Sequence, residues 1–356
     1  MWRSSTGAPL LFDRFGIITE KARVAVTKLF KGRSAAKDGL PTLDAAVVAK
    51  VASKLGCSVT PIESKPVFLE KSAKRKTKRK YVRHLVRAGE PVDRDIMVFT
   101  KTGLQAANEA VEHYISETRL PEFRAPIYYG RAATEEGDTG IWEYIPGDLP
   151  LLHRCTGDEL RRIAQAVGAI NTLTADVTHR VPNIPVDTMR SAPVAEQLRA
   201  TLIDEGELLR RDPTLLSALD HFATLEKGAL ARLAAIGNRF FSHQDIASGN
   251  VLLPPAPDPV AILDWESAAI AAPGVGLRRF ATFNMKIQQA VAEHYVAYLQ
   301  TKGISLEVGD VLFVMGTVQV MNSLHNGANR LVDAPTTAEK AISWGLAHAP
   351  DYLRRG

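Results

Sequence analysis

The chain has 356 residues, of which 46% are hydrophobic and 23% charged, and its formal net charge is +5. This balance is that of a soluble globular protein and argues against wholesale disorder. The sequence has no apolar run long enough to cross a membrane, and its N-terminus is a poor secretory signal. The only two cysteines, Cys57 and Cys155, cannot build a disulfide framework, so we expect a cytoplasmic protein.

Positive charge is concentrated in residues 71–80, KSAKRKTKRK, which contain seven lysines and arginines and no acidic residue. Because seven exceeds the net charge of +5, the basic balance is a property of this run and not of the whole surface. Three interpretations stay open: a solvated loop, a clamp for a triphosphate or an anionic acceptor, and a docking segment for an anionic partner or a membrane surface. No aromatic residue interrupts the run, so we expect no stable nucleic-acid complex.

Residues 1–42 are interpreted as an N-terminal extension that is partly helical. Apolar residues recur there at helical spacing, with basic neighbours: Ile18, Ala22, Ala25 and Leu29. Such a helix either packs on the main body or lies on an anionic membrane, which would make the protein peripheral at that surface.

Residues 43–146 predict a small antiparallel sheet with helices. A first helix over 43–55 ends at Gly56, a residue typical of helix ends. A second helix is expected over 104–116. Strands are predicted over residues 58–62, 67–69, 81–86, 96–100, 127–129 and 141–145.

Residues 147–356 predict a mainly helical region. Thr156 and Glu159 have the spacing of a capping box at the start of a helix. Further helices are expected over residues 194–209, 214–236 and from 288 onward. Three short strand-like runs interrupt this pattern, over residues 239–242, 251–253 and 260–263.

The polar residues that indicate chemistry stand at the ends of these short strands. The first set reads His243-x-Asp245-x-x-x-x-Asn250, and Asp264 directly follows the apolar run 260–263. A carboxylate at the end of a buried strand is costly unless it is paired or binds a cation. Mg²⁺ accepts amide and carboxylate oxygens, and a second carboxylate can take the proton of an attacking hydroxyl. The pattern therefore indicates phosphoryl transfer.

The first motif, followed by Asp264-Trp265-Glu266, resembles the aminoglycoside phosphotransferase and choline kinase family, which shares its core with protein kinases. The resemblance covers about residues 43–285. It implies an α+β, bilobal protein-kinase-like fold, with a sheet-containing N-lobe over 43–146 and a helical C-lobe over 147–356. It also implies Mg²⁺ as cofactor, ATP or GTP as phosphate donor, and a small-molecule hydroxyl as acceptor, on an aminoglycoside, a sugar or an amino alcohol.

The family resemblance implies a role for each residue of the two C-lobe motifs. Asp245 would be the catalytic base, and Asn250 and Asp264 would hold magnesium. His243 would brace the catalytic loop by hydrogen bonds, and Glu266 would support the site.

The N-lobe also contains residues that match the family. Lys101, at the end of a predicted strand, would contact the nucleotide phosphates. Glu109 would orient this lysine, with Glu112 as the alternative. The run GIWEYIPG resembles the strand that crosses to the C-lobe, where the backbone of Glu143 and Ile145 would bind the adenine.

Three positions depart from the family pattern. Gln244 stands where glycine is usual, and Ile170-Asn171 replaces a usual Leu-His. Gly276 stands where the motif after Asp-Trp-Glu usually has its last aspartate, so an anchor of the catalytic loop is missing or replaced.

A rival hypothesis is a non-catalytic nucleotide-binding or regulatory protein on the same fold, which docks on an anionic partner through residues 71–80. The presence of Asp245, Asn250 and Asp264 argues against it, because a degenerate kinase would be expected to lose at least one of them.

Overall fold

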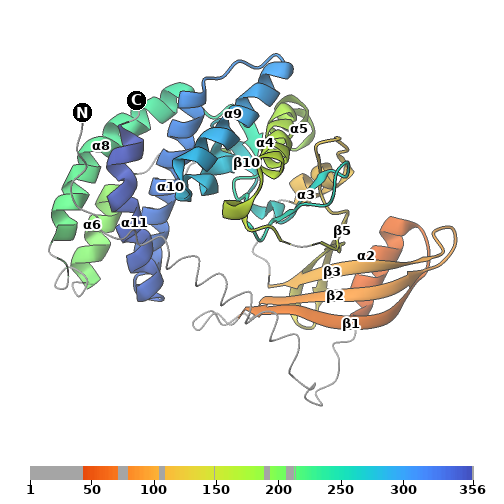
Figure 1. The fold of residues 1–356 in the computed structure, drawn as a ribbon. Coiled ribbons are helices and arrows are strands. Elements are labelled where there is room, and N and C mark those ends of the chain that lie inside the picture. The colour runs from red at the N-terminus through yellow and green to blue at the C-terminus, as the bar shows by residue number, and fades with distance from the viewer. Residues whose placement is uncertain are drawn as a thin grey trace. The chain divides into compact units, whose positions relative to one another are not determined.

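The N-lobe is built around a five-stranded antiparallel sheet with the strand order β1-β2-β3-β6-β5 (Figure 1). The computed structural model describes residues 43–70, 79–103, 109–147, 149–187, 193–205, 212 and 214–354, and only the backbone of residues 66–70, 79, 80 and 205. The sheet strands are β1 (Val59–Glu70), β2 (Arg79–Ala88), β3 (Arg94–Thr102), β5 (Tyr128–Thr134) and β6 (Gly137–Glu143). The predicted N-terminal helix within 1–42 and residues 71–78 of the basic run lie outside the described residues.

Strand β1 is longer than the sequence pattern predicts. The two expected runs, 58–62 and 67–69, belong to one edge strand, whose pairing with β2 shifts register between Pro61 and Glu63 and again between Pro66 and Phe68. Proline lacks a backbone N–H and is tolerated at strand edges and bulges, which explains why the strand continues through both prolines.

Helix α2 (Ala45–Leu55) covers the sheet through an apolar face. It begins at Asp44, whose side chain accepts a hydrogen bond from the Ala46 N–H at 2.8 Å, and ends at Gly56 in the left-handed conformation. Its buried residues Val47 and Val51 pack with apolar side chains of the strands, among them Val59, Val86, Val98 and Ile141.

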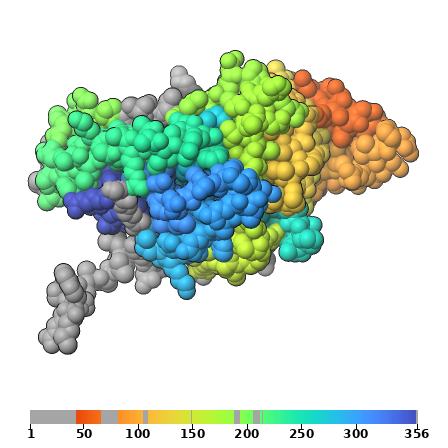
Figure 2. Space-filling model, turned by 90° about the horizontal axis from the view of Figure 1, so that it is seen from above, coloured from red at the N-terminus to blue at the C-terminus, as the bar shows by residue number. Residues whose placement is uncertain are grey.

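The C-lobe is mainly helical, which confirms the predicted bilobal α+β fold. Helix α4 (Gly157–Thr172) starts with the capping box predicted at Thr156 and Glu159. The other α-helices described in this lobe are α5 (Thr174–Arg180), α6 (Val194–Glu205), α8 (Thr214–Ile236), α9 (Met285–Thr301), α10 (Val308–Arg330) and α11 (Pro335–Leu353). Helices α6 and α8 lie side by side on the surface (Figure 2). Among the helices of the described ranges, none is long and apolar enough to span a membrane.

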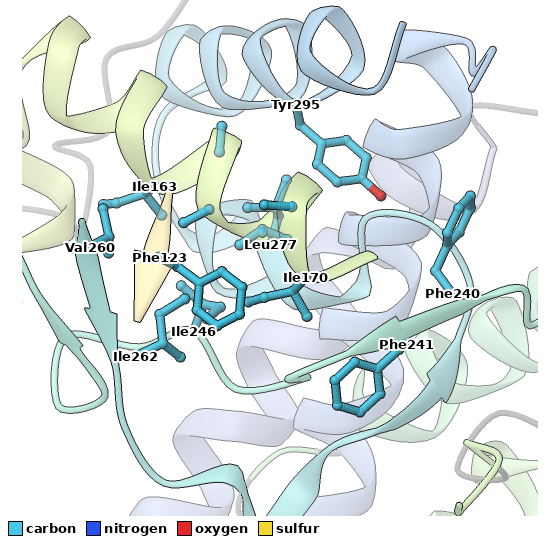
Figure 3. Close-up of a cluster of buried hydrophobic side chains, with 14 of the residues drawn as sticks. Phe123, Ile163, Ile170, Phe240, Phe241, Ile246, Val260, Ile262, Leu277 and Tyr295 are labelled. Carbon is cyan, nitrogen blue, oxygen red and sulfur yellow. The ribbon is translucent and has the colours of Figure 1, made fainter. Parts of the chain in front are cut away.

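Short strands, all from the C-lobe except β4, position the polar motifs. Strands β4 (Phe123–Arg124), β9 (Val260–Ile262) and β8 (Val251–Leu252) form one small sheet, while β7 (Phe240–Ser242) pairs with β10 (Ala269–Ala271). Their apolar side chains meet those of α4 and α9 in one core, where Phe123, Ile170, Phe241, Ile262 and Tyr295 are buried (Figure 3). The loops that leave these strands therefore start from a fixed, close-packed base.

Candidate active site

The β8–β9 hairpin brings Asn250 and Asp264 to the same end of the small sheet. Val251 pairs with Ile262, and the Leu263 N–H donates to the Asn250 carbonyl oxygen at 2.9 Å. Asn250 thus directly precedes one strand and Asp264 closely follows the other, so the antiparallel register makes them neighbours.

The loop of residues 243–250, the predicted catalytic loop, is held to this hairpin by His243. Its Nε2 lies 2.8 Å from the Leu263 carbonyl oxygen, and its Nδ1 accepts from the Asp245 N–H at 3.3 Å. Since Nδ1 accepts, Nε2 carries the proton and donates to Leu263. The ring packs edge-on against Trp265, and burial lowers the pKa of His243, which keeps the imidazole neutral in this role.

Asp264 sits in the left-handed backbone region, with φ of 63°, at the turn between β9 and the short helix η2 (Trp265–Ser267). Its Oδ1 accepts a hydrogen bond from Lys101 Nζ at 3.0 Å, and Glu266 Oε2 accepts from the same nitrogen at 3.0 Å. The structure thus brings a residue of β3 against two carboxylates of the C-lobe.

Lys101 is buried, with only 4% of its surface exposed. Burial opposes its charge, but the carboxylates of Asp264 and Glu266 outweigh burial and raise the pKa of Lys101 above its usual value. The lysine is therefore held charged at the interface of the two lobes.

The structure differs from the prediction that Glu109 orients Lys101. Glu109, at the start of α3 (Glu109–Glu117), instead accepts a hydrogen bond from the Tyr128 hydroxyl at 2.8 Å. The alternative, Glu112, is buried on the inner face of the helix and accepts from Trp142 Nε1 at 3.0 Å. Lys101 takes its two hydrogen-bonded carboxylates from the C-lobe.

Burial raises the pKa of Glu112 to about 7, against the opposing effect of its hydrogen bond from Trp142. The nearby charges of Asp264 and Glu266 raise it further, and that of Lys101 lowers it. Glu112 is thus the helix carboxylate that shares its electrostatic environment with the lysine and its two partners.

The predicted adenine-binding segment leaves the sheet at the end of β6. The Glu143 carboxylate accepts two hydrogen bonds from Arg124 Nη2, at 2.6 and 2.5 Å, and one from the Ile127 N–H at 3.2 Å. The Tyr144 N–H donates to the Met97 carbonyl oxygen at 2.9 Å, which ties the segment to β3 just before Ile145. The Glu143 side chain therefore anchors the segment, while nucleotide binding by the backbone of Glu143 and Ile145 stays a prediction.

The sequence pattern missed two arginines that hold Asp245. Arg278 and Arg279 belong to the short helix η3 (Val275–Thr282). Arg279 donates to Asp245 Oδ1 from Nε at 3.0 Å and from Nη2 at 2.9 Å, and Arg278 Nη2 reaches the same oxygen at 3.2 Å. Asp245 is thus oriented through one of its two carboxylate oxygens.

Arg278 also anchors the catalytic loop where the family's aspartate is missing. Its Nε donates to the Gln244 carbonyl oxygen at 2.8 Å, and its Nη1 donates to Gln319 Oε1 of α10 at 3.1 Å. At Gly276, an added Cβ would lie 3.1 Å from Val167 Cγ1 and 3.3 Å from the Ser242 hydroxyl, so the usual aspartate would be crowded. The anchor is therefore replaced, and the only signal in the sequence was the Gly276 departure.

Asn171, the other departure, supports the strand before the catalytic loop. Its Nδ2 donates to the Phe241 carbonyl oxygen at 2.6 Å, and its Oδ1 accepts from the Tyr295 hydroxyl at 2.5 Å. This buried amide fixes β7 against α4 and α9, so the position has a structural role in this chain.

Four of the predicted site residues, Asp245, Asn250, Asp264 and Glu266, line one cavity of about 150 Å³. Its wall consists of Gln244, Asp245, Asn250, Asp264, Glu266, Ser267 and Arg278. The structure therefore brings residues of the predicted catalytic loop and the carboxylates of Asp264 and Glu266 around one space. Lys101 forms a hydrogen bond to each of these two carboxylates.

The donor set fits Mg²⁺. Asn250 Nδ2 donates to the Asp245 carbonyl oxygen at 3.0 Å. The amide nitrogen of Asn250 therefore faces Asp245, and its amide oxygen points away from that bond and can bind a metal. An amide oxygen and the Asp264 carboxylate are hard oxygen ligands, and Mg²⁺ takes the rest of its shell from phosphates and water. Within the described ranges, no group of three or more His, Cys, Asp or Glu side chains could hold a metal by itself.

Comparison with known proteins places this site in a family context. The chain matches the phosphotransferase enzyme family over residues 104–306, more than half of its length. No curated protein sequence matches it.

Three solved structures are similar to the chain. Choline kinase from Cryptosporidium parvum has 12% identity and a TM-score of 0.55, covering 82% of this chain and 89% of that one. Spectinomycin phosphotransferase, in complex with ADP and spectinomycin, has 11% identity and a TM-score of 0.56, covering 89% and 100%. Ethanolamine kinase from Plasmodium vivax has 10% identity and a TM-score of 0.52, covering 82% and 83%. At such identities these likenesses show a shared kinase-like fold.

Proposed function

Because the chain belongs to the phosphotransferase enzyme family, we propose that it transfers the γ-phosphate of ATP or GTP to a hydroxyl group of a small molecule, with Mg²⁺ as cofactor. The observation that carries this proposal is the gathering of Asp245, Asn250 and Asp264 around one cavity. The similar spectinomycin phosphotransferase was solved with ADP, which supports a nucleotide as donor.

Asp245 is proposed as the group that receives the acceptor hydroxyl. Arg278 and Arg279 bind its Oδ1, while Oδ2 has one weak contact, at 3.4 Å from Asn250 Nδ2. Oδ2 is thus the oxygen to which an acceptor hydroxyl would donate its hydrogen bond and pass its proton. The hydroxyl oxygen would then form the new P–O bond while the bond from the γ-phosphorus to the β-phosphate oxygen breaks and the nucleoside diphosphate leaves. Holding Oδ1 fixes the direction of the hydrogen bond at Oδ2, which is the positioning that phosphoryl transfer needs.

The nucleotide phosphates are proposed to lie between Lys101 and Asp264, the carboxylate that follows β9. Asn250 and Asp264 would hold Mg²⁺, which when bound supplies positive charge to the phosphate oxygens. The Lys101 ammonium is already placed 3.0 Å from Asp264 Oδ1, so it can meet a phosphate oxygen close to the metal ligands.

The first test is isothermal calorimetry of ATP and GTP binding, with and without Mg²⁺. The native chain should bind one of the nucleotides only in the presence of Mg²⁺, and Asp264→Asn should weaken binding by about tenfold or more, since a charged ligand is lost. Asp258→Asn, an exposed aspartate in the loop of the same β8–β9 hairpin, is the matched control and should bind like the native chain. Absence of nucleotide binding under every condition would overturn the proposal and favour a regulatory protein that docks on an anionic partner.

A further inference from the structure

Every carboxylate in the wall of the cavity is already bound to a cation of the chain. Asp264 and Glu266 share Lys101, and Asp245 is bound by Arg278 and Arg279. A cationic acceptor would have to compete with these internal cations for the same oxygens, and approach of like charges is unfavourable. The described wall of the cavity is therefore poorly suited to an ammonium-bearing acceptor.

Two guanidinium groups, those of Arg278 and Arg279, bind the single carboxylate of Asp245, so this side of the site carries one positive charge more than Asp245 neutralises. Among the described residues, the guanidinium of Arg279 contacts Oδ1 of Asp245 through Nε and Nη2 and nothing else, and it shares that oxygen with Arg278. The Arg279 side chain is 39% exposed, so it stays accessible to a ligand while it binds Asp245. A guanidinium has five N–H donors in a planar fork, which suits it to bind a second anion beside the first.

A narrower second cavity, of about 30 Å³, adjoins the first where Gln244 and Arg278 line both. The rest of its wall is formed by Asp187, Val275, Val318, Met321, Asn322 and His325. Quaternary ammonium ligands are usually held by aromatic cages, whereas this described wall has no Phe, Tyr or Trp: it combines aliphatic and amide side chains with one imidazole, the Asp187 carboxylate and the Arg278 guanidinium. The second cavity thus lacks the lining expected for a choline-like group.

From these charges we infer that the acceptor is a hydroxyl compound that also carries a carboxylate or phosphate group, and that Arg279 binds this anionic group while the hydroxyl meets Asp245. This inference rests on the proposed phosphotransfer. It distinguishes this chain's substrate from polycationic aminoglycosides and from amino alcohols, because the anion pairs with a guanidinium already placed beside the base.

The test compares three acceptor sets at fixed Mg²⁺ and ATP, with ADP formation as the readout: sugar phosphates and uronic acids, neutral sugars and polyols, and choline, ethanolamine and aminoglycosides. Only the anionic set should raise ADP formation above the acceptor-free rate. For the responding compound, Arg279→Gln should raise the KM of the acceptor by about tenfold or more, with the KM of ATP unchanged, and Arg279→Lys should raise it less. Arg161→Gln, an exposed arginine of α4, is the control that should behave like the native chain.

The outcomes separate this inference from the proposed function. Stimulation by the neutral or cationic set, stimulation by none of the sets, or an acceptor KM that Arg279→Gln leaves unchanged would each overturn the anionic acceptor. Failure of Mg²⁺-dependent nucleotide binding in the calorimetry would instead overturn the phosphotransfer itself.

Discussion

Lys101 Nζ lies 3.0 Å from Asp264 Oδ1, across 163 residues of sequence. The same nitrogen lies 3.0 Å from Glu266 Oε2, so one buried ammonium holds two carboxylates that would otherwise repel each other. Because β3 belongs to the N-lobe and both carboxylates to the C-lobe, this contact links the lobes at the place where phosphate would bind.

We expect Lys101→Met to abolish transfer and to lower stability. Transfer should fall by about a hundredfold or more, since the loss removes a charge aimed at the phosphates. The free energy of unfolding should fall by about 1–2 kcal/mol, a modest amount because both carboxylates are partly exposed. The measurements are ADP formation and urea unfolding.

A double variant separates the two effects of Lys101→Met. Adding Glu266→Gln removes one of the two carboxylates left without their cation, so stability should partly recover while transfer stays lost. A Lys101→Met chain that transfers phosphate at the native rate would contradict the assignment of this lysine.

We expect Arg278 to control the geometry of the catalytic loop. Arg278→Ala should lower kcat by about tenfold to a hundredfold with little change in the KM of ATP, because its contacts are to Asp245, Gln244 and Gln319. Hydrogen exchange of the amides in residues 243–250 should become faster in the same variant. Gln319→Leu should shift both readouts in the same direction but less, since it removes one of the contacts of Arg278 and leaves those to Gln244 and Asp245.

Conservative replacement tests whether the arginine's geometry matters. Arg278→Lys keeps the charge but cannot reach Gln244, Asp245 and Gln319 together, so its kcat should lie between those of the native chain and Arg278→Ala. Unchanged kcat and unchanged exchange in Arg278→Ala would show that the loop is held without this residue.

The elements with clear local signals were predictable from the sequence. Helix α4 begins with the capping box read from Thr156 and Glu159, and α2 ends at Gly56 as expected. Strand β1 was predicted as two runs, because a proline at position 66 looks like a break unless the strand is known to be at an edge.

The choice between Glu109 and Glu112 could not be made from the sequence. The two residues are three apart on one helix, so both fall near the same face. Burial of Val111 and Ile115 sets the rotation of α3 about its axis. In that orientation Glu112 is buried, and Glu109 accepts a hydrogen bond from Tyr128.

The replacement of the loop anchor was also hidden from the sequence. Arg278 reaches Gln244 because η3 presents it there and because Gln319 of α10 holds its other end. The contact joins two residues that are 41 positions apart. A local sequence pattern does not predict that such distant residues meet.

We expect Glu112→Gln to stabilise the protein at alkaline pH. The pKa of Glu112 is raised to about 7 in the folded chain, above its ordinary value of 4.5. The folded state therefore binds this proton more tightly than the unfolded state, and stability falls as pH rises from about 4.5 to about 7. Glutamine stays neutral and can still accept a hydrogen bond from Trp142. Above pH 7 the free energy of unfolding of the variant should therefore exceed that of the native chain by on the order of 2 kcal/mol.

The control for this gain is Glu109→Gln, a substitution of an exposed carboxylate on the same helix. It should show no stability gain that grows with pH in urea unfolding. A native chain and a Glu112→Gln chain with parallel stability curves across the pH range would show that Glu112 is not a buried titrating group.

We expect His84 to make the N-lobe sensitive to acid. Its Nδ1 lies 2.8 Å from the Ser64 hydroxyl and its Nε2 lies 3.0 Å from the Thr100 hydroxyl, so this buried imidazole joins β1, β2 and β3. Burial lowers the pKa of His84 from 6.5 to about 4. The neutral form is therefore the one that the folded state favours.

The sign of the effect follows from the lowered pKa. The stability contribution of neutral His84 is complete above about pH 6.5 and is lost as pH falls towards about 4, where the folded chain also takes up the proton. The shift corresponds to a loss of about 3 kcal/mol across this window. His84→Gln cannot titrate, so its stability should depend less on pH there, whereas His179→Gln, an exposed histidine of α5, should keep the native slope in urea unfolding. A His84→Gln chain with the native slope would assign the acid sensitivity to other groups.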